Sequence, residues 1–318
     1  MTRTGPVAVL EPMTADMQSF VRKICPGLDM RFPRSGHPDD FADIVVDAPY
    51  IVTRGLRFPA SVLEQARAVR LIHQWGTGTD GIPLVEARAR GITVARSPGV
   101  NAPTVADMTI GLMLATLRRI PQVHASMRTG QWEMKDLWQR TFDLSSATVG
   151  LIGLGAIGQQ VAARLQGFGC EIVYTKPSGP VAGSSLRFAD MDALLAQCDV
   201  ISLHLPLTAD THHLLGPDCL ALMKPGSVLI NTSRGALVDE TALVAALESA
   251  HLAGAGLDVF EKEPVAADNP LLALDSVVTL PHVSGLTRDN LVRMVSHWAA
   301  NITAFDQGQP IDPACLVR

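Results

Sequence analysis

The stretch VGLIGLGAIGQQVAARL, residues 149–165, decides the fold of this chain. Its glycines follow the pattern G-x-G-x-x-G at Gly153, Gly155 and Gly158, directly after an apolar run and directly before a helical pattern. Glycines at this spacing permit a tight turn and let a diphosphate rest on the N–H groups at a helix N-terminus. The stretch therefore predicts a dinucleotide-binding loop. The competing interpretation is a glycine-containing turn in an unrelated α/β protein.

From this loop to residue 285, strands and helices alternate. Apolar runs predict six strands, which are TVGLIG (148–153), EIVY (171–174), DVISLHL (199–205), SVLINTS (227–233), AGLDV (255–259) and VVTL (277–280). Helical segments such as 191–197 and 240–249 separate them. Six strands joined by crossover helices suit a doubly wound parallel sheet. We expect this dinucleotide-binding domain to span residues 99–285.

The first part of the chain shows the same alternation, so we expect a second parallel sheet there. Apolar runs predict strands at 7–10, 44–53 and 71–76, and an amphipathic segment predicts a helix at 61–69. The tail, residues 286–305, is also amphipathic and is expected to return to this domain. The substrate-binding domain would then consist of residues 1–98 and 286–318.

Composition argues against several classes of partner. A net charge of −5 without a block of Lys or Arg argues against nucleic acid and against an anionic membrane surface. The cysteines lack CxxC pairs and nearby histidines, so neither a metal site nor a disulfide framework is expected; they are Cys25, Cys170, Cys198, Cys219 and Cys315. Free thiols, and the lack of an apolar run long enough to span a bilayer, predict a cytoplasmic protein.

Seven ordered stretches resemble the D-isomer-specific 2-hydroxyacid dehydrogenase family over nearly the whole chain. They are GTGTDGI (76–82), GITVARSPGVNAPTVAD (91–107), GLIGLGAIG (150–158), CDVISLHLPLTADTHHLL (198–215), MKPGSVLINTSRGALVDE (223–240), AGLDVFEKEP (255–264) and LPHVSG (280–285). The resemblance implies an α/β fold of two doubly wound parallel-sheet domains, with a Rossmann-type cofactor domain inserted in a flavodoxin-like substrate domain. It also implies hydride transfer between NADP(H) or NAD(H) and a small 2-oxo or 2-hydroxy acid of D configuration.

Three residues match the family's catalytic positions: Arg234 in NTSRG, Glu263 in EKEP and His282 in LPHVSG. Their chemistry suits the reaction. A planar guanidinium can grip a carboxylate in two places, and an imidazole paired with a carboxylate can donate a proton as hydride arrives at carbon. Alone, such an arginine or histidine is commonly a surface or turn residue. Their order after a nucleotide-binding fold favours the catalytic interpretation.

The glycine pattern, the loop after the second strand and the resemblance together predict contacts to cofactor and substrate. The expected cofactor contacts are Gly153, Gly155, Ala156, Ile157, Gly158, Thr175, Lys176, His204, Pro206, Thr232, Ser233, Asp258 and Gly285. Among them, Asp258 is expected to accept the nicotinamide carboxamide, with a helix cap or surface acid as its alternative role. The expected substrate contacts are the backbone of Trp75, Gly76, Thr77 and Gly78, together with Arg234.

The stretch VYTKPSG, residues 173–179, lacks the acidic residue that commonly ends the second strand and binds the ribose 2′-hydroxyl. Lys176, with Thr175 and Ser178 beside it, could instead pair with a 2′-phosphate, which a carboxylate would repel. We therefore expect a preference for NADP(H), with NAD(H) possible. The alternative is that Lys176 is solvated in a permissive NAD(H) enzyme.

The motifs do not name the acid. A preference for NADPH points to reduction of glyoxylate or hydroxypyruvate. Arg54 and Arg288 could receive a second acidic group, although the favoured interpretation is that both are solvated. Two alternatives stay open: an NAD-dependent dehydrogenase of a phosphorylated, sulfonated or phosphite-like acid, and a non-catalytic dinucleotide-sensing protein.

The helical stretch NAPTVADMTIGLMLATL, residues 101–117, is more apolar than one buried face requires. The resemblance implies that this helix packs on its twin in a homodimer. Burial of the helix inside one subunit is the competing explanation.

Overall fold

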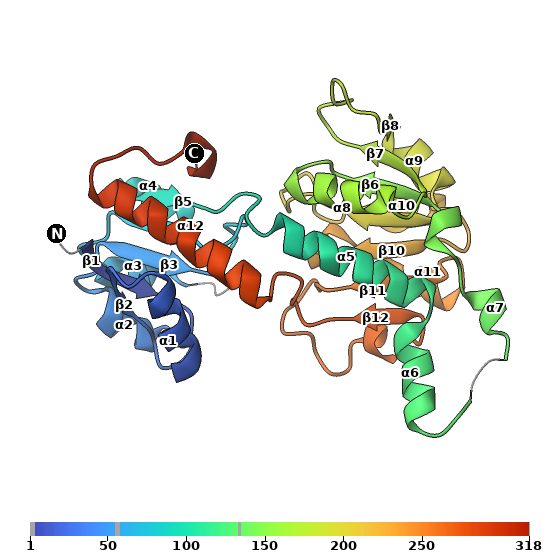
Figure 1. The fold of residues 1–318 in the computed structure, drawn as a ribbon, viewed down its shortest axis with the longest axis horizontal. Helices are drawn as coiled ribbons and strands as arrows, with labels where there is room; N and C mark the ends of the chain where they lie inside the picture. Colours follow the sequence, from blue (N-terminus) through green and yellow to red (C-terminus); the bar gives the residue numbers. More distant parts are fainter. Residues whose placement is uncertain (1–3, 55–57, 133–134, 318) are drawn as a thin grey trace. The chain divides into compact units, whose positions relative to one another are not determined.

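The computed structural model describes residues 4–54, 58–132 and 135–317, and its backbone separates into two compact units (Figure 1). Unit 1 consists of Met1–Asn101 and Leu286–Arg318, and unit 2 consists of Ala102–Gly285. The first boundary between the units therefore falls after Asn101. The sequence predicts this boundary three residues earlier, after residue 98.

Unit 1 is built on a parallel sheet in the order β2-β1-β3-β4-β5, which is the flavodoxin-like arrangement. Its strands are β1 (Thr4–Val9), β2 (Leu28–Arg31), β3 (Tyr50–Thr53), β4 (Leu71–Gln74) and β5 (Thr93–Ala95). Because the strands are parallel, the residues that follow them lie along one edge of the sheet.

Helices cover both faces of this sheet; they are α1 (Ala15–Ile24), α2 (Asp39–Val45), α3 (Ala60–Gln65), α4 (Leu84–Ala89) and α12 (Arg288–Asp306), followed by the 3₁₀ turn η4 (Pro313–Cys315). One core joins the sheet to α1 and α12 around the fully buried Trp298. The other joins it to α2, α3 and α4 around Phe41. The predicted strand at 44–53 is wrong in its first half, because Ile44 and Val45 form the last turn of α2. Pro49 disfavours helix in the residue before it, so the helix cannot continue, and β3 begins only at Tyr50.

Unit 2 is built on a seven-stranded parallel sheet in the order β12-β11-β10-β9-β6-β7-β8. Its strands are β6 (Thr148–Ile152), β7 (Glu171–Thr175), β8 (Arg187–Phe188), β9 (Val200–Leu203), β10 (Val228–Asn231), β11 (Gly254–Leu257) and β12 (Val277–Thr279). The sequence predicts six of them; β8 has two residues and no apolar run to reveal it. The strand order reverses between β6 and β9, and open α/β sheets bind ligands at such a switch point.

Most helices of unit 2 form a layer on each face of the sheet. The helices are α5 (Ala102–Leu117), α6 (Ile120–Arg128), α7 (Leu137–Arg140), α8 (Ala156–Gln166), α9 (Met191–Gln197), α10 (Pro217–Leu222) and α11 (Glu240–Glu248), with 3₁₀ turns η1 (Leu144–Ser146), η2 (Gly235–Leu237) and η3 (Pro270–Ala273). Helices α5 and α8 pack on one face, and α9, α10 and α11 on the other. Ten of the 16 residues of α5 are buried in this packing. Packing within unit 2 therefore accounts for much of the apolar character of α5, while Met108, Leu114 and Ala115 are only partly buried and Gly111 is exposed.

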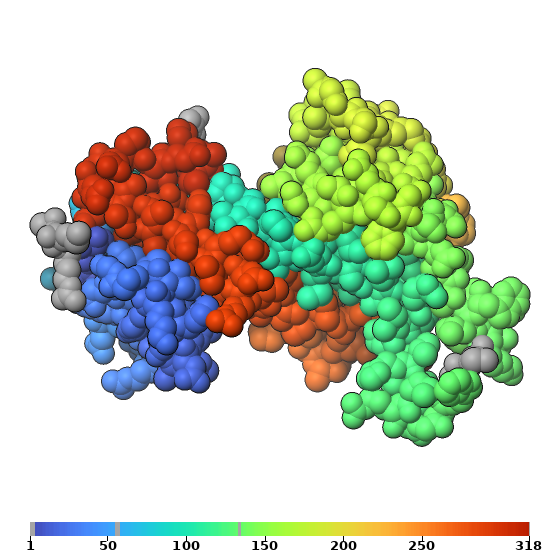
Figure 2. Space-filling view, in the orientation of Figure 1, coloured from blue at the N-terminus to red at the C-terminus, as the bar shows by residue number. Residues whose placement is uncertain are grey.

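Helices α6 and α7 stand away from the sheet of unit 2 and form a green lobe in the space-filling view (Figures 1 and 2). We call residues 120–132 and 135–142 the arm. Trp132 and Trp138 of the arm are each 77% exposed, and Ile120, Met127 and Phe142 are exposed as well. A concentration of large exposed apolar side chains is unusual on a monomer. Within the ranges described above, no helix is long and apolar enough to cross a membrane.

Candidate active site

The glycine turn is held by two close backbone contacts. Gly153 has a φ of +100°, and a Cβ at this position would lie 2.3 Å from the carbonyl oxygen of His204. A Cβ on Gly158 would lie 2.3 Å from the carbonyl oxygen of Gly153. By contrast, a Cβ on Gly155 would meet nothing within 4 Å. Two glycines therefore close the turn, and the third leaves room above it.

The helix that follows, α8, begins at this open position. Its N-cap is Gly155, which has no side chain to accept the N–H groups of the first turn. Gly155 and Ala156 are exposed, and Ile157 is half-buried. Such N–H groups, together with the positive end of the helix dipole, bind anions. The first turn of α8 therefore fits the diphosphate of a dinucleotide.

The end of β7 carries the expected basic residue. Thr175 is buried and Lys176 is half-buried at the start of a turn, in which the N–H of Gly179 donates to the carbonyl oxygen of Lys176 at 3.0 Å. The hydroxyl of the buried Tyr174 accepts the N–H of Val181 at 2.7 Å. The loop after β7 is thus fixed at both ends, with a cation where an acid is commonly found.

His204 follows β9 beside the glycine turn, with only 8% of its surface exposed. Burial lowers its pKa to about 3, so the ring is neutral at physiological pH. Its Nε2 lies 2.9 Å from the hydroxyl oxygen of Ser202, and its Nδ1 is buried without a hydrogen bond among the residues described. Pro206 is exposed two residues further on. His204 therefore packs under the turn, mainly through its backbone.

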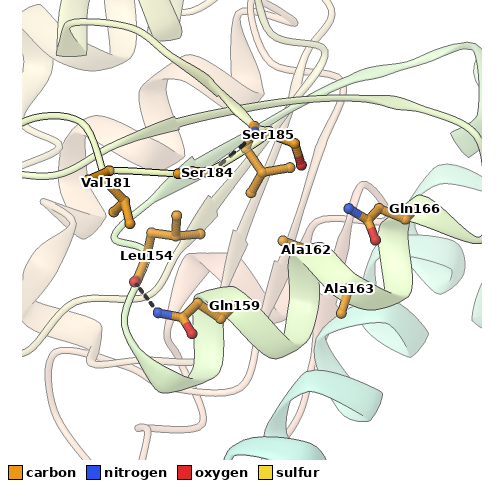
Figure 3. A pocket seen from close by; sticks show the side chains of 11 residues that line it. Leu154, Gln159, Ala162, Ala163, Gln166, Val181, Ser184 and Ser185 are labelled. Carbon is orange, nitrogen blue, oxygen red and sulfur yellow. Dashed lines mark hydrogen bonds between the residues drawn. The ribbon is translucent and has the colours of Figure 1, made fainter.

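A hollow of about 370 Å³ lies along the side of α8 (Figure 3). Its wall is formed by Leu154 of the glycine turn, by Gln159 and Gln166 of α8, and by Val181 and Ser185 of the loop after β7. None of the three expected catalytic residues lines it. The hollow borders the glycine turn but is separate from the acid–base groups described next.

Glu263 and His282 form an acid–histidine pair in which the carboxylate Oε2 lies 2.7 Å from the ring Nδ1. The other carboxylate oxygen accepts the N–H of Phe260 at 3.1 Å. Burial raises the pKa of Glu263, but hydrogen bonding and the positive charges of His282 and Arg234 outweigh burial and hold the pKa below its ordinary range. The carboxylate therefore stays ionised at neutral pH and fixes which ring nitrogen faces it.

Arg234 comes from the loop after β10, whose shape is set by one side chain. Asn231 donates to the carbonyl oxygen of Arg234 at 2.8 Å and accepts the N–H of Ser233 at 3.0 Å. The hydroxyl of Thr232 lies 2.9 Å from that of Thr109 in α5. Ser233 donates to a backbone carbonyl of β9 at 2.6 Å. The two expected contact residues before Arg234 thus anchor its loop to the surrounding unit.

Asp258 is held by three backbone N–H groups of the chain itself. It is fully buried, and its two carboxylate oxygens accept the N–H groups of Val283 and Ser284, each at 2.8 Å. Its carbonyl oxygen accepts the N–H of His282, also at 2.8 Å. An ionised carboxylate can accept about four hydrogen bonds, so these two leave capacity for a nicotinamide carboxamide. The carboxylate also holds the loop 282–285, in which His282 adopts a left-handed φ of +55°.

Two glutamates that the sequence analysis did not single out join the loop of Arg234 to the loop of Glu263. The N–H of Glu240 donates to Glu261 Oε1 at 3.0 Å, and the N–H of Glu261 donates to Glu240 Oε1 at 2.6 Å. We call this reciprocal pair the glutamate clasp. The Nε2 of His213 lies 2.9 Å from Glu261 Oε1. No local pattern reveals the clasp, because its members lie 21 residues apart.

The two loops also touch through their backbones. A Cβ on Gly235 would lie 1.8 Å from the carbonyl carbon of Phe260, so only glycine fits beside this peptide group. Gly235 directly follows Arg234, and Phe260 is the residue whose N–H binds Glu263. The position of Arg234 is therefore tied to that of Glu263 by packing as well as by the clasp.

In unit 1, the expected substrate loop follows β4. The ring of Trp75 packs in the core 5.8 Å from the ring of Trp298, and the backbone N–H of Trp75 donates to the carbonyl oxygen of Thr53 at 2.7 Å. Trp75 is therefore a core residue with its N–H engaged in the sheet. Gly76, Thr77 and Gly78 are at least partly exposed, and the carbonyl oxygen of Gly76 accepts the N–H of Ser97 at 2.9 Å.

The two candidate cations of unit 1 have partners. Arg54 pairs with Glu11 at 3.2 Å, and the guanidinium carbon of Arg288 lies 5.2 Å from the centre of the Phe20 ring. Neither side chain is simply solvated. In the described parts of the chain, no group of three or more His, Cys, Asp or Glu residues could hold a metal ion.

A doubly wound sheet with an open glycine turn at its switch point, beside an arginine and an acid–histidine pair, defines a dinucleotide-dependent oxidoreductase. The chain belongs to the D-isomer specific 2-hydroxyacid dehydrogenase family, because the family description "D-isomer specific 2-hydroxyacid dehydrogenase, NAD binding domain" matches residues 110–284. This match confirms the resemblance found in the sequence.

Similarity to individual proteins supports the same family assignment. The chain is 41% identical to a glyoxylate reductase of Thermococcus litoralis, over 78% of this chain and 77% of that protein. It is 38% identical to a hydroxypyruvate reductase of Thermotoga maritima, over 79% of this chain and 82% of that protein. Its structure resembles an NADPH-dependent glyoxylate/hydroxypyruvate reductase from Sinorhizobium meliloti in complex with NADP and malonate, with a TM-score of 0.82, 32% identity and 99% of both chains covered.

The glutamate clasp can be tested by a double-mutant cycle. Glu240→Ala or Glu261→Ala removes an acceptor and loosens the loops of Arg234 and Glu263, so we expect kcat with a 2-oxo acid to fall roughly ten- to a hundredfold, with a smaller change in KM. Because the two residues act as one unit, the double variant should be no slower than the slower single variant. Glu248→Ala, at the exposed end of α11, is the control. Losses that multiply in the double variant would show that the glutamates act separately.

Proposed function

We propose that the protein reduces small 2-oxo acids of the glyoxylate and hydroxypyruvate type to the corresponding 2-hydroxy acids, with NADPH as the preferred reductant. One observation carries the proposal: the 2.7 Å contact between Glu263 and His282 in the same unit as the open glycine turn, with Arg234 close enough to lower the pKa of Glu263. The relatives named glyoxylate reductase and hydroxypyruvate reductase support the choice of acid.

The three residues divide the chemistry. Arg234 holds the substrate carboxylate and polarises the carbonyl oxygen, because a guanidinium can donate to two acceptors at once. His282, with Nδ1 at Glu263, donates the Nε2 proton to that oxygen as the carbonyl carbon accepts hydride. The bound dinucleotide supplies the hydride. Glu263 stabilises the protonated ring before transfer and keeps it oriented, so the same pair acts as a base in the direction of oxidation.

The same geometry supports the contacts to the dinucleotide that we propose. The first turn of α8 binds the diphosphate, and the end of β7 faces the adenosine ribose. Lys176 and the neighbouring hydroxyls pair with a 2′-phosphate, which supports a preference for NADPH over NADH. Gly76, Thr77 and Gly78 of unit 1 bind the substrate carboxylate through their backbone. Asp258 holds the His282 loop and also accepts the nicotinamide carboxamide, because an ionised carboxylate can accept more than two hydrogen bonds.

Removing the proton donor tests the reaction. His282→Gln keeps a side chain of similar reach but cannot deliver the proton, so kcat for reduction of glyoxylate and hydroxypyruvate should fall roughly a hundred- to ten-thousandfold. Binding of NADPH, followed by its fluorescence, should be unchanged. His37→Gln, on the surface of unit 1, serves as the control. A His282→Gln enzyme with near-wild-type turnover would remove His282 from the mechanism.

The cofactor preference is tested at one position. Lys176→Asp should lower the ratio of kcat/KM for NADPH to that for NADH by roughly tenfold or more, because a carboxylate repels the 2′-phosphate and can bind the 2′-hydroxyl. Lys176→Gln, which removes the charge without reversing it, should give an intermediate ratio. The ratio is measured with hydroxypyruvate at saturation. An unchanged ratio across this series would show that Lys176 does not determine the cofactor preference.

We also propose a homodimer and a cytoplasmic location. The arm, with Trp132 and Trp138 each 77% exposed, supplies the apolar surface that a second copy would cover. Helix α5 contributes as well, because Met108, Leu114 and Ala115 stay partly exposed on the face that its own unit does not bury. The five cysteines are free, which suits a reducing compartment.

Light scattering tests the dimer. The wild-type chain should give the mass of two copies, and Trp132→Ser combined with Trp138→Ser should shift it toward one, because the interface loses its largest apolar side chains. A wild-type protein with the mass of one chain would contradict the dimer.

A further inference from the structure

Glu11, Arg54 and Trp75 form a row at the edge of the unit 1 sheet where its strands end. Val9 of β1 pairs with Val52 of β3, and Thr53 of β3 pairs with Gln74 of β4. Continuing these registers by one or two residues places Glu11 beside Arg54, and Arg54 beside Trp75. The Gln74 side chain also donates to the carbonyl oxygen of Arg54 at 2.6 Å. The Glu11–Arg54 pair therefore lies next to the loop that begins at Gly76.

The pair is partly enclosed. The side chain of Glu11 is 18% exposed and that of Arg54 is 30% exposed, with 3.2 Å between carboxylate and guanidinium. Burial raises the pKa of Glu11, and the charge of Arg54 opposes that rise. One cation thus lies against a half-enclosed carboxylate, and part of that cation is exposed, so that a small molecule can reach it.

We propose that Glu11 is a specificity-determining residue, which cancels the charge of Arg54 beside the substrate loop and restricts the enzyme to 2-oxo acids with a single acidic group. The inference rests on the proposed function, because it assumes that the loop from Gly76 binds the substrate carboxylate.

The argument is electrostatic. An arginine at this edge, without a carboxylate partner, would attract a phosphate, sulfonate or second carboxylate on the substrate. With Glu11 in place, an anionic group that approaches Arg54 also comes close to the carboxylate of Glu11. Repulsion between these like charges disfavours binding. A neutral hydroxyl has no such conflict, because it can donate to Glu11 or accept from Arg54. Another cation follows β5 at this edge. It is Arg96, whose charge opposes the rise that burial causes in the pKa of the Cys315 thiol.

The experiment compares acids of different charge. Wild type and Glu11→Gln are assayed with hydroxypyruvate, which carries one acidic group, and with 3-phosphohydroxypyruvate and oxaloacetate, which carry a second. Glutamine keeps the size of the side chain and its acceptor oxygen but not its charge. We expect Glu11→Gln to raise kcat/KM for the doubly acidic substrates by roughly tenfold relative to hydroxypyruvate. Glu64→Gln, an exposed glutamate of α3, makes the same change in net charge and should change nothing.

A second variant assigns the gain to the arginine. Glu11→Gln combined with Arg54→Gln should lose the gained activity, because the cation that Glu11 masked is gone. Equilibrium binding of D-malate against D-lactate to the NADP⁺-loaded protein gives the same comparison without turnover. Unaltered selectivity in Glu11→Gln, or a gain that survives loss of Arg54, would overturn the inference. Wild-type protein inactive on all these acids would instead overturn the proposed function, while the D-malate comparison still decides the role of Glu11.

Discussion

Unit 2 depends on a backbone contact that only glycine allows. The first turn of α8 rests on the carbonyl group of Gly153, and Gly153 rests on the carbonyl group of His204, each closer than any Cβ could come. These two contacts bring β6, α8 and the end of β9 together at the point where the strand order reverses. The loop of Arg234 follows β10, the next strand along, and is anchored to β9 through Ser233. The site therefore takes its position from the turn.

Dense local constraints explain what could be predicted from the sequence. A glycine turn needs three fixed positions within six residues, and the arginine, glutamate and histidine each sit in a short distinctive stretch after a strand. Features that depend on distant backbone groups were not predictable. The carboxylate of Asp258 is bonded to N–H groups 25 and 26 residues away, so its orientation cannot be deduced from its own stretch. The same holds for the glutamate clasp, and a strand as short as β8 leaves no pattern at all.

Two glutamates in this chain show how partners decide the behaviour of one residue type. Both are partly enclosed, and enclosure alone disfavours the ionised form. Glu263 receives a backbone N–H and a histidine N–H in addition to nearby cations, and its pKa falls. Glu11 has a single arginine, and its pKa rises. The first arrangement suits a group that must stay charged during a reaction. The second arrangement suits a carboxylate whose main interaction is with the neighbouring Arg54.

The insertion of unit 2 into unit 1 has a consequence for synthesis on the ribosome. Unit 1 takes its core residues Met294, Val295, Trp298 and Ile302 from α12, and residues near its C-terminus bridge to Ala95. None of these exists until the whole of unit 2 has been made. Unit 2 is one continuous segment and can fold as it emerges, whereas the five strands of unit 1 wait with an apolar face uncovered. The order of folding therefore runs opposite to the order in which the strands are made, and the nascent first domain is the part of this chain that needs protection from aggregation.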